Sequence, residues 1–196
     1  MKVLALAWVT LLPCLAGSPD IDKEKALGGL GAPILIEVYS SFACSHCKDF
    51  HEKILPLIVR DYVVQGKVCV VNREFFPPNH AVAIEAANDA TAAARIGKYQ
   101  AVADALFRNQ QQWVVSRNVW DTVASVLTPA QQKQVQSLAK DPAVTGEVKG
   151  DMDRGQAVGI KGTPTLYVTH GSKTYPLNGV PEYSLFKSFV DGLLAK

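Results

Sequence analysis

The fold of this chain is decided by one stretch, Phe42-Ala43-Cys44-Ser45-His46-Cys47-Lys48-Asp49-Phe50. It follows the apolar run Ile34 to Tyr39, whose β-branched residues are typical of a buried strand. After it, apolar residues recur every three or four positions, which indicates a helix. The two cysteines are therefore expected at a turn that leads from a strand into a helix.

A cysteine at this position is chemically activated. The first turn of a helix has unpaired N–H groups and a partial positive charge, and both favour a thiolate over a thiol. We therefore expect Cys44 to be the nucleophile and Cys47, one turn later, to close a disulfide with it and release a bound partner. The intervening Ser45 and His46 set the redox poise, since His46 places a cation or an N–H donor near the sulfur. Lys48 adds positive charge, and stabilising the thiolate makes the disulfide a better oxidant.

Other interpretations of these cysteines remain open. Cys44, Cys47 and His51 also fit the spacing of metal ligands, so a metal-binding or chaperone module is the alternative from a different class. A structural zinc site needs four ligands, and no second CxxC or His pair follows. Haem attachment requires His directly after the second cysteine, where this chain has Lys48. A purely structural disulfide here closes a very short loop and stabilises weakly.

Composition limits the class of protein. The 196 residues are 48% hydrophobic and 19% charged, which indicates a globular chain with one substantial core, or a domain with a large insertion. The formal net charge is +2 and no block of Lys and Arg occurs, so we expect no nucleic acid partner.

The N-terminus predicts export. Met1-Lys2 precede an apolar segment of about ten residues, which is too short to span a bilayer, and small residues follow at the end of it. We expect a signal peptide over residues 1–16, removed after Ala16, and a periplasmic or otherwise exported protein. A buried N-terminal strand or helix in a cytosolic protein is the alternative. Pro13 before Cys14 argues against a lipid anchor, because a small residue is expected there.

Export also explains how few cysteines the chain has. Removal of the signal leaves Cys44, Cys47 and Cys69. An exported protein with a single CxxC pair is expected to act on the disulfides of other proteins. Cys69 lies within an apolar run and is interpreted as a small buried hydrophobe.

The order of elements is βαβ, then helices, then ββα. Residues 17–32 are expected to form an exposed leader with a short helix, and Pro56 should kink the helix that follows the cysteines. Two helices are expected to start at proline after the capping residues Thr128 and Asp141. A third insert helix is expected from Asn118 to Leu127. The expected strands and the other helices have these ranges: strands 34–40, 68–75, 162–168 and 174–177, and helices 80–96, 99–107 and 185–194.

These motifs, in this order, resemble the DsbA-like family of thioredoxin-fold proteins over about residues 33 to 194. The resemblance rests on the CxxC, on Arg73-Glu74-Phe75-Phe76-Pro77 followed by His80 and an alanine-rich helix, and on Ala157 to Thr165, which ends in Gly-Thr-Pro-Thr. It implies an α/β, thioredoxin-like fold with an all-helical insertion between the second and third core strands. The thioredoxin-like domain then comprises residues 33–77 and 157–196, and the insertion comprises residues 78–156.

The resemblance further implies a thiol:disulfide oxidoreductase. It would donate its disulfide to reduced substrate proteins through a mixed disulfide at Cys44. Pro164 would be cis, with the Thr163 backbone binding the substrate peptide. A quinone-linked membrane protein would re-oxidise it, and we expect a monomer without a cofactor. The alternative within the same fold is a disulfide reductase or isomerase.

Two positions depart from the family pattern. Ser45 stands where relatives often have proline, which loosens any inference about the redox potential. Many relatives have a buried acid six residues before the first cysteine, where this chain has Val38. Glu37 is one residue away and is expected to face the other side of the sheet. His80 is expected to cap or anchor the first insert helix.

Overall fold

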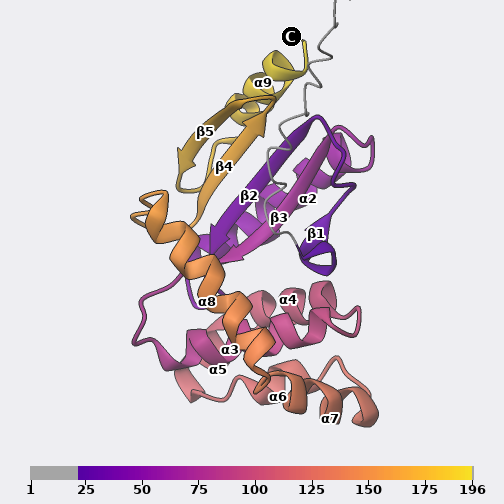
Figure 1. The fold of residues 1–196 in the computed structure, drawn as a ribbon, viewed down its shortest axis with the longest axis vertical. Helices are drawn as coiled ribbons and strands as arrows, with labels where there is room; N and C mark the ends of the chain where they lie inside the picture. Colours follow the sequence, from indigo (N-terminus) through magenta and orange to yellow (C-terminus); the bar gives the residue numbers. More distant parts are fainter. Residues whose placement is uncertain (1–21, 196) are drawn as a thin grey trace, which may run out of the picture.

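A five-stranded mixed sheet forms the centre of the upper half of the molecule (Figure 1). The computed structural model describes residues 22–195, so the expected signal peptide lies outside the described residues. The strand order is β1-β3-β2-β4-β5. β2 and β3 are parallel, as the crossover pattern predicted, and the other neighbours are antiparallel. The strands are β1 Ala26–Leu27, β2 Ile34–Ser40, β3 Val68–Glu74, β4 Thr165–His170 and β5 Lys173–Asn178.

The helical segment after β2 is continuous but irregular around Pro56. It consists of α1 Ser45–Asp49, the π-helical turn η2 Phe50–Ile54, α2 Leu55–Ile58 and the π-helical turn η3 Val59–Val63. Pro56 has no N–H to donate, and the chain accommodates it with wider turns, in which Leu55 donates to the carbonyl of Phe50. The predicted disturbance at Pro56 therefore takes the form of π-helical turns.

The chain between β3 and β4 is helical in the described structure. Thr128 and Asp141 are the N-cap residues of α7 and α8, as predicted, and each is followed by proline. α5 was not anticipated, because its sequence has no apolar stripe, and α6 is shorter than the expected helix from Asn118 to Leu127. The helices are α3 Ala81–Ala94, α4 Tyr99–Arg108, α5 Gln110–Ser116, α6 Trp120–Ala124, α7 Pro129–Leu138 and α8 Pro142–Ala157.

The two sides of the sheet are covered differently. One face packs against the α1 to η3 segment and against α9, Tyr183–Leu194, through a buried cluster that includes Ile36, Ile58 and Val190. The other face packs against α8, where Gly155 lies against Phe75 and Tyr39. A second core fills the insertion around Trp113 and includes Cys47. The turn that carries the two cysteines therefore lies where the two cores meet.

The described part of the expected leader, residues 22–32, packs partly onto the fold, whereas we expected it to be exposed. A short 3₁₀ helix covers Lys23–Lys25, and Ala26–Leu27 pair with β3. Lys25 is buried, and its charge is compensated by the carboxylate of Asp151 on α8, which lies 2.9 Å from its ammonium. A two-residue strand has too few residues for a hydrophobic pattern to reveal it. No helix among residues 22–195 is long and apolar enough to cross a membrane.

Candidate functional site

The two cysteines lie at the junction that the sequence predicted. Cys44 is the N-cap residue of α1 with extended backbone angles, and its N–H donates to the carbonyl of Ser41 just beyond β2. Cys44 is half-buried, whereas Cys47 is 1% exposed, and both are free thiols in this structure. The turn thus presents one sulfur to solvent and keeps the other inside.

The surroundings of Cys44 stabilise its thiolate. The pKa of Cys44 is lowered to about 5, chiefly because the thiol of Cys47 donates a hydrogen bond to its sulfur. Burial opposes this shift, while the Thr163 side chain and the backbone N–H groups of Cys47 and His46 add to it. The free N–H groups of the first helical turn thus act on the sulfur as the sequence predicted.

Cys47 has the opposite character. Its pKa is raised, first because its proton is shared with Cys44 and second because it is buried. The N–H of Ser41 lies 3.5 Å from its sulfur, and the Ser40 side chain also contacts it. At neutral pH the pair therefore holds one proton, on Cys47, and one negative charge, on Cys44.

The residues expected to tune the pair lie around it in different ways. Ser45 and His46 are exposed, and the contribution of His46 named above comes from its backbone N–H. The ammonium of Lys48 donates to the carbonyl of Arg108 at 3.1 Å and lies 3.7 Å from Glu52. Lys48 therefore ties α1 to the insertion.

Thr163 and Pro164 face Cys44 from the loop before β4. Their peptide bond is cis, and the carbonyl of Thr163 lies 3.4 Å from the Cys44 sulfur. This loop, Cys44, Asn79 and His80 line a groove of about 450 Å³, and a second groove of about 500 Å³ follows the loop itself. The site therefore has room on both sides of the Thr163–Pro164 bond for an extended polypeptide.

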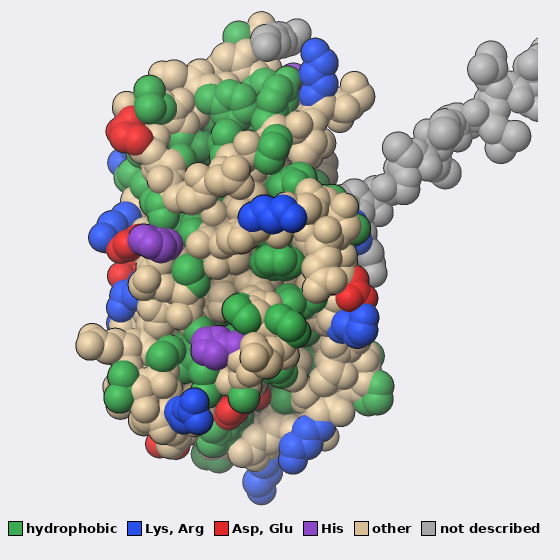
Figure 2. Space-filling view, turned by 90° about the vertical axis from the view of Figure 1, so that its left-hand side faces the viewer, with side chains coloured by type: hydrophobic (Ala, Val, Ile, Leu, Met, Phe, Trp, Pro, Cys, Tyr) green, Lys and Arg blue, Asp and Glu red, His purple; other side chains and the backbone are tan. Residues whose placement is uncertain are grey.

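This region faces the viewer in Figure 2. The connection from β3 to α3 and the loop from α8 to β4 both lie on the left side of Figure 1, which is the side that Figure 2 shows. On this face hydrophobic side chains gather in several patches and charged side chains are scattered between them (Figure 2). Exposed apolar patches of this kind are typical of surfaces that bind other molecules.

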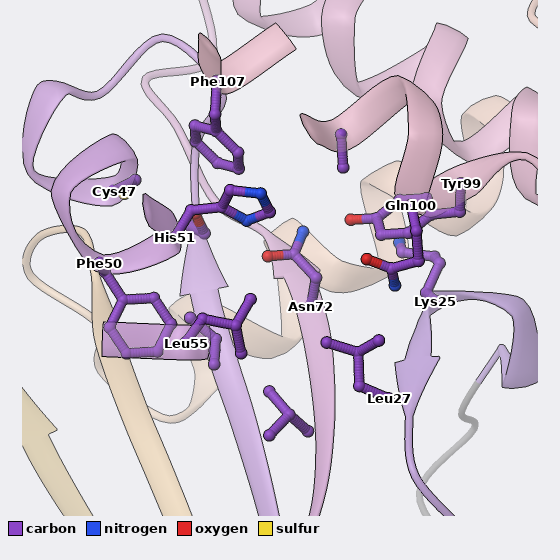
Figure 3. Close-up of a pocket in the computed structure, with 14 residues that line it drawn as sticks. Lys25, Leu27, Cys47, Phe50, His51, Leu55, Asn72, Tyr99, Gln100 and Phe107 are labelled. Carbon is purple, nitrogen blue, oxygen red and sulfur yellow. The ribbon is translucent and has the colours of Figure 1, made fainter. Parts of the chain in front are cut away.

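A small cavity of about 30 Å³ lies behind Cys47, between the sheet and α4 (Figure 3). His51 and Asn72 point into it. His51 bonds to Asp104 at 2.7 Å and stacks on Phe107, with ring centroids 4.5 Å apart. Within residues 22–195, no group of three His, Cys, Asp or Glu side chains could hold a metal ion. The metal alternative therefore gains no support from the geometry around His51.

Two carboxylates, Glu37 and Glu74, lie near the site on opposite sides of the sheet. Val38 is buried, and Glu37 pairs with Arg73 at 3.0 Å on the α8 side of the sheet, which is the opposite side from Cys47, as expected. The acid on the Cys47 side is Glu74, whose partner in the β2–β3 register is Ser40. Glu74 is fully buried, and burial raises its pKa to about 8. No pattern in the sequence indicated a role for Glu74 beyond its place in the family motif.

Cys69, His80 and Gln110 lie near the site or were named in the sequence. Cys69 is buried, as predicted, with its sulfur 3.9 Å from the carbonyl of Gly28. His80 is the N-cap residue of α3, but its side chain makes no capping hydrogen bond. Gln110 was missed: its buried amide donates to the carbonyls of Phe42 and Cys44, and nothing distinguishes it in sequence from the two glutamines that follow.

Known proteins resemble the chain along most of its length. A family model described as Thioredoxin matches residues 21–180. Disulfide bond formation protein D of Bacillus subtilis is 27% identical over 165 residues, which are 79% of this chain and 71% of that protein. A putative protein-disulfide oxidoreductase of Rickettsia bellii is 25% identical over 170 residues, 81% of this chain and 62% of that protein.

Solved structures agree on the fold. The crystal structure of alpha-DsbA1 from Wolbachia pipientis superposes with a TM-score of 0.69 at 24% identity, over 86% of this chain and 89% of that one. Oxidised BdbD from Bacillus subtilis superposes with a TM-score of 0.70 at 23% identity, over 88% and 93%. The expected sheet with a helical insertion is confirmed by these likenesses and by the strand order.

Proposed function

Because the chain belongs to the thioredoxin family, and within it to the DsbA-like thiol:disulfide oxidoreductases, we propose that it oxidises thiol pairs in other proteins by donating a Cys44–Cys47 disulfide. The single observation that supports this direction is the contrast between the two sulfurs. One is an accessible thiolate with a pKa of about 5, and the other is a buried thiol.

The reaction begins with the oxidised pair. A substrate thiolate attacks the sulfur of Cys44, the Cys44–Cys47 bond breaks, and Cys47 leaves and takes up a proton. A second thiolate of the substrate then attacks the substrate sulfur of the mixed disulfide and displaces Cys44 as a thiolate. Two electrons pass from the substrate to the cysteine pair. Because Cys44 is stabilised as an anion, it is a good leaving group in the second step.

Substrate positioning is assigned to Thr163 and Pro164. The carbonyl that precedes the cis bond lies beside Cys44, and the grooves on either side accommodate extended chain. Ser45 and His46, being exposed next to the reacting sulfur, are proposed to contact the substrate and to tune the potential. No cofactor is needed, because the cysteine pair itself carries the electrons.

The cellular setting is part of the proposal. An oxidant of protein thiols works in an oxidising compartment, which agrees with the apolar N-terminal segment interpreted as a signal peptide. The reduced pair must be re-oxidised by an external electron acceptor, which we propose to be a quinone-linked membrane protein. We further propose that the chain acts as a monomer.

The experiment measures oxidation of a reduced test protein. Wild type and Cys69→Ala should oxidise it, whereas Cys44→Ser and Cys47→Ser should not, because neither variant can form the disulfide that is donated. Full activity of Cys44→Ser would refute the assignment. The alternatives predict other results. A reduction potential near that of thioredoxin, measured in equilibrium with glutathione, would indicate a reductase. Metal bound in stoichiometric amount by a protein that shows no thiol exchange would indicate a metal-binding module.

A further inference from the structure

A groove of about 660 Å³ in the helical insertion has no role in the chemistry described above. It lies between α3, α6 and the end of α7. Its lining combines the aromatic ring of Trp120 with Glu85, Asn88 and Asp89 on α3, and Lys140 lies just beyond α7. Glu85 and Asp89 are four residues apart, so both are on the same face of the helix.

Asp89 is an unusual member of this lining. It is only 6% exposed, and the described part of the chain offers its carboxylate neither a hydrogen bond nor an ion pair. Burial, and then the neighbouring charge of Glu85, raise the pKa of Asp89 to about 7. A buried carboxylate without a partner is costly, so the site favours any ligand that brings a positive charge or a hydrogen-bond donor.

A second polar atom in the groove also has no partner. The carbonyl oxygen of the Asn88 side chain is buried, and no described residue donates to it. The groove is therefore lined by the Asp89 carboxylate, a hydrogen-bond acceptor for a donor-rich group, and beside it by Asn88, whose buried oxygen also lacks a donor. Trp120 also lines the groove, where an aromatic ring can attract a cation, and Ile84 and Ala139 add apolar surface. These features match a cationic head on an apolar stem, as in arginine and lysine.

The position of the groove indicates where such a side chain comes from. His80 lines the groove beside Cys44, and Ala81, the next residue, lines this one. From His80 to Asp89 the helix rises roughly 14 Å, which about four residues of extended chain can span. A polypeptide held at Cys44 can therefore reach the groove along α3.

We propose that this groove binds an arginine or lysine side chain of the substrate polypeptide while a substrate cysteine reacts at Cys44. The inference rests on the proposed function and adds a preference: substrates with a basic residue about four to six positions from the reacting cysteine are oxidised faster. Asp89 and Asn88 receive the cationic head, and Trp120 covers its stem.

The experiment compares matched reduced peptides. Each carries one cysteine pair, and arginine is placed at successive positions three to seven residues before or after the reacting cysteine, with citrulline at the same position as the uncharged match. The measured quantity is the second-order rate constant for oxidation of the peptide by the disulfide form in a single turnover. Wild type should prefer arginine about tenfold at one or two positions. Asp89→Asn should remove most of that preference, because it should slow oxidation of the arginine peptide far more than that of the citrulline peptide.

A loss of preference in Asp89→Asn can be told apart from a loss of folding. Asp89→Asn keeps the shape of the side chain and removes a buried charge, so it should fold at least as well as wild type. Asp153→Asn, an exposed acid-to-amide change on α8, is the matched control and should keep the preference. The arginine-to-citrulline ratio should also rise from pH 6 to pH 8 as Asp89 ionises, with Glu85 and Lys140 as the other charged groups in the groove.

Equal second-order rate constants for the two peptides at every position would overturn the inference and leave the proposed function intact. So would an equal loss of preference in Asp89→Asn and Asp153→Asn, because that result indicates a general charge effect. If wild type oxidises neither peptide, the proposed function itself fails.

Discussion

The side-chain amide of Gln110 donates a hydrogen bond of 2.9 Å to the backbone carbonyl of Cys44. The same amide nitrogen lies 2.6 Å from the carbonyl of Phe42. Gln110 is the first residue of α5, so the helical insertion directly fixes the loop that carries the reacting sulfur. The insertion is therefore part of the active-site framework as well as a cover for it.

Replacing Gln110 by Ala should disturb both stability and the thiolate. The carbonyl of Phe42 loses this donor inside the protein and the carbonyl of Cys44 keeps only the N–H of Lys48, which should lower the free energy of unfolding by about 2 kcal/mol. The loop should then hold the sulfur less well over the N–H groups of α1, so the pKa of Cys44 should rise. Thiolate absorbance against pH measures this shift. Gln111→Ala, on the exposed side, is the control, and an unchanged Cys44 pKa in Gln110→Ala would show that the role is structural only.

Thr163 offers a more direct test of the charge on Cys44. Its side chain stabilises the thiolate by a hydrogen bond, so Thr163→Val should raise the pKa of Cys44 from about 5 by roughly half to one unit. Because the thiolate is then less favoured, the disulfide should become a weaker oxidant. Thr163→Ser keeps the hydroxyl and should restore both values. A Cys44 titration that is identical in the Val and Ser variants would contradict the assignment.

The parts of the fold that the sequence predicted well share one physical property: their signals are local. The β-branched run before Phe42, the capping residues Thr128 and Asp141, and the Gly-Thr-Pro-Thr loop each determine structure within a few residues. The strand-to-helix junction at Cys44 is of the same kind, and it placed both cysteines correctly.

The features that the sequence did not reveal depend on contacts between distant segments. Gln110 reaches the active-site loop across 66 residues of chain, and Lys25 reaches Asp151 across 126. A glutamine or a lysine carries no sign of such a partner. Glu74 was read only as part of a family motif, although its burial makes it the acid on the Cys47 side of the sheet.

Glu74 should make the stability of the protein depend on pH. Its pKa is raised from 4.5 to about 8 in the folded protein, mainly by burial, with Lys25 opposing and Asp151 and Glu147 adding to the shift. A raised pKa means that folding favours the protonated form. The contribution to stability is therefore complete below about pH 4.5 and is lost as the pH rises through about 8.

Glu74→Gln should remove this dependence. Relative to the variant, wild type should lose on the order of 3 kcal/mol of unfolding free energy between pH 5 and pH 8, as measured by denaturant unfolding at each pH. Glu52→Gln, at a partly exposed position, is the control and should follow wild type. Parallel curves for wild type and Glu74→Gln would show that the Glu74 carboxyl does not titrate in this range.

Gly155 determines how closely α8 approaches the sheet. A Cβ at this position would lie 2.5 Å from a ring carbon of Phe75 and 3.2 Å from one of Tyr39, so the rings would have to move. Gly155→Ala should therefore lower the free energy of unfolding by roughly 1 to 3 kcal/mol, despite the higher helix propensity of alanine. Gly150→Ala in the same helix meets no atom within 4 Å and should stabilise the protein by up to about 1 kcal/mol. Thermal unfolding measures the change in stability of both variants. If Gly155→Ala destabilises the protein and Gly150→Ala stabilises it, packing against Phe75 sets the position of α8. If both variants are equally stabilised, α8 can shift away from the sheet at no cost.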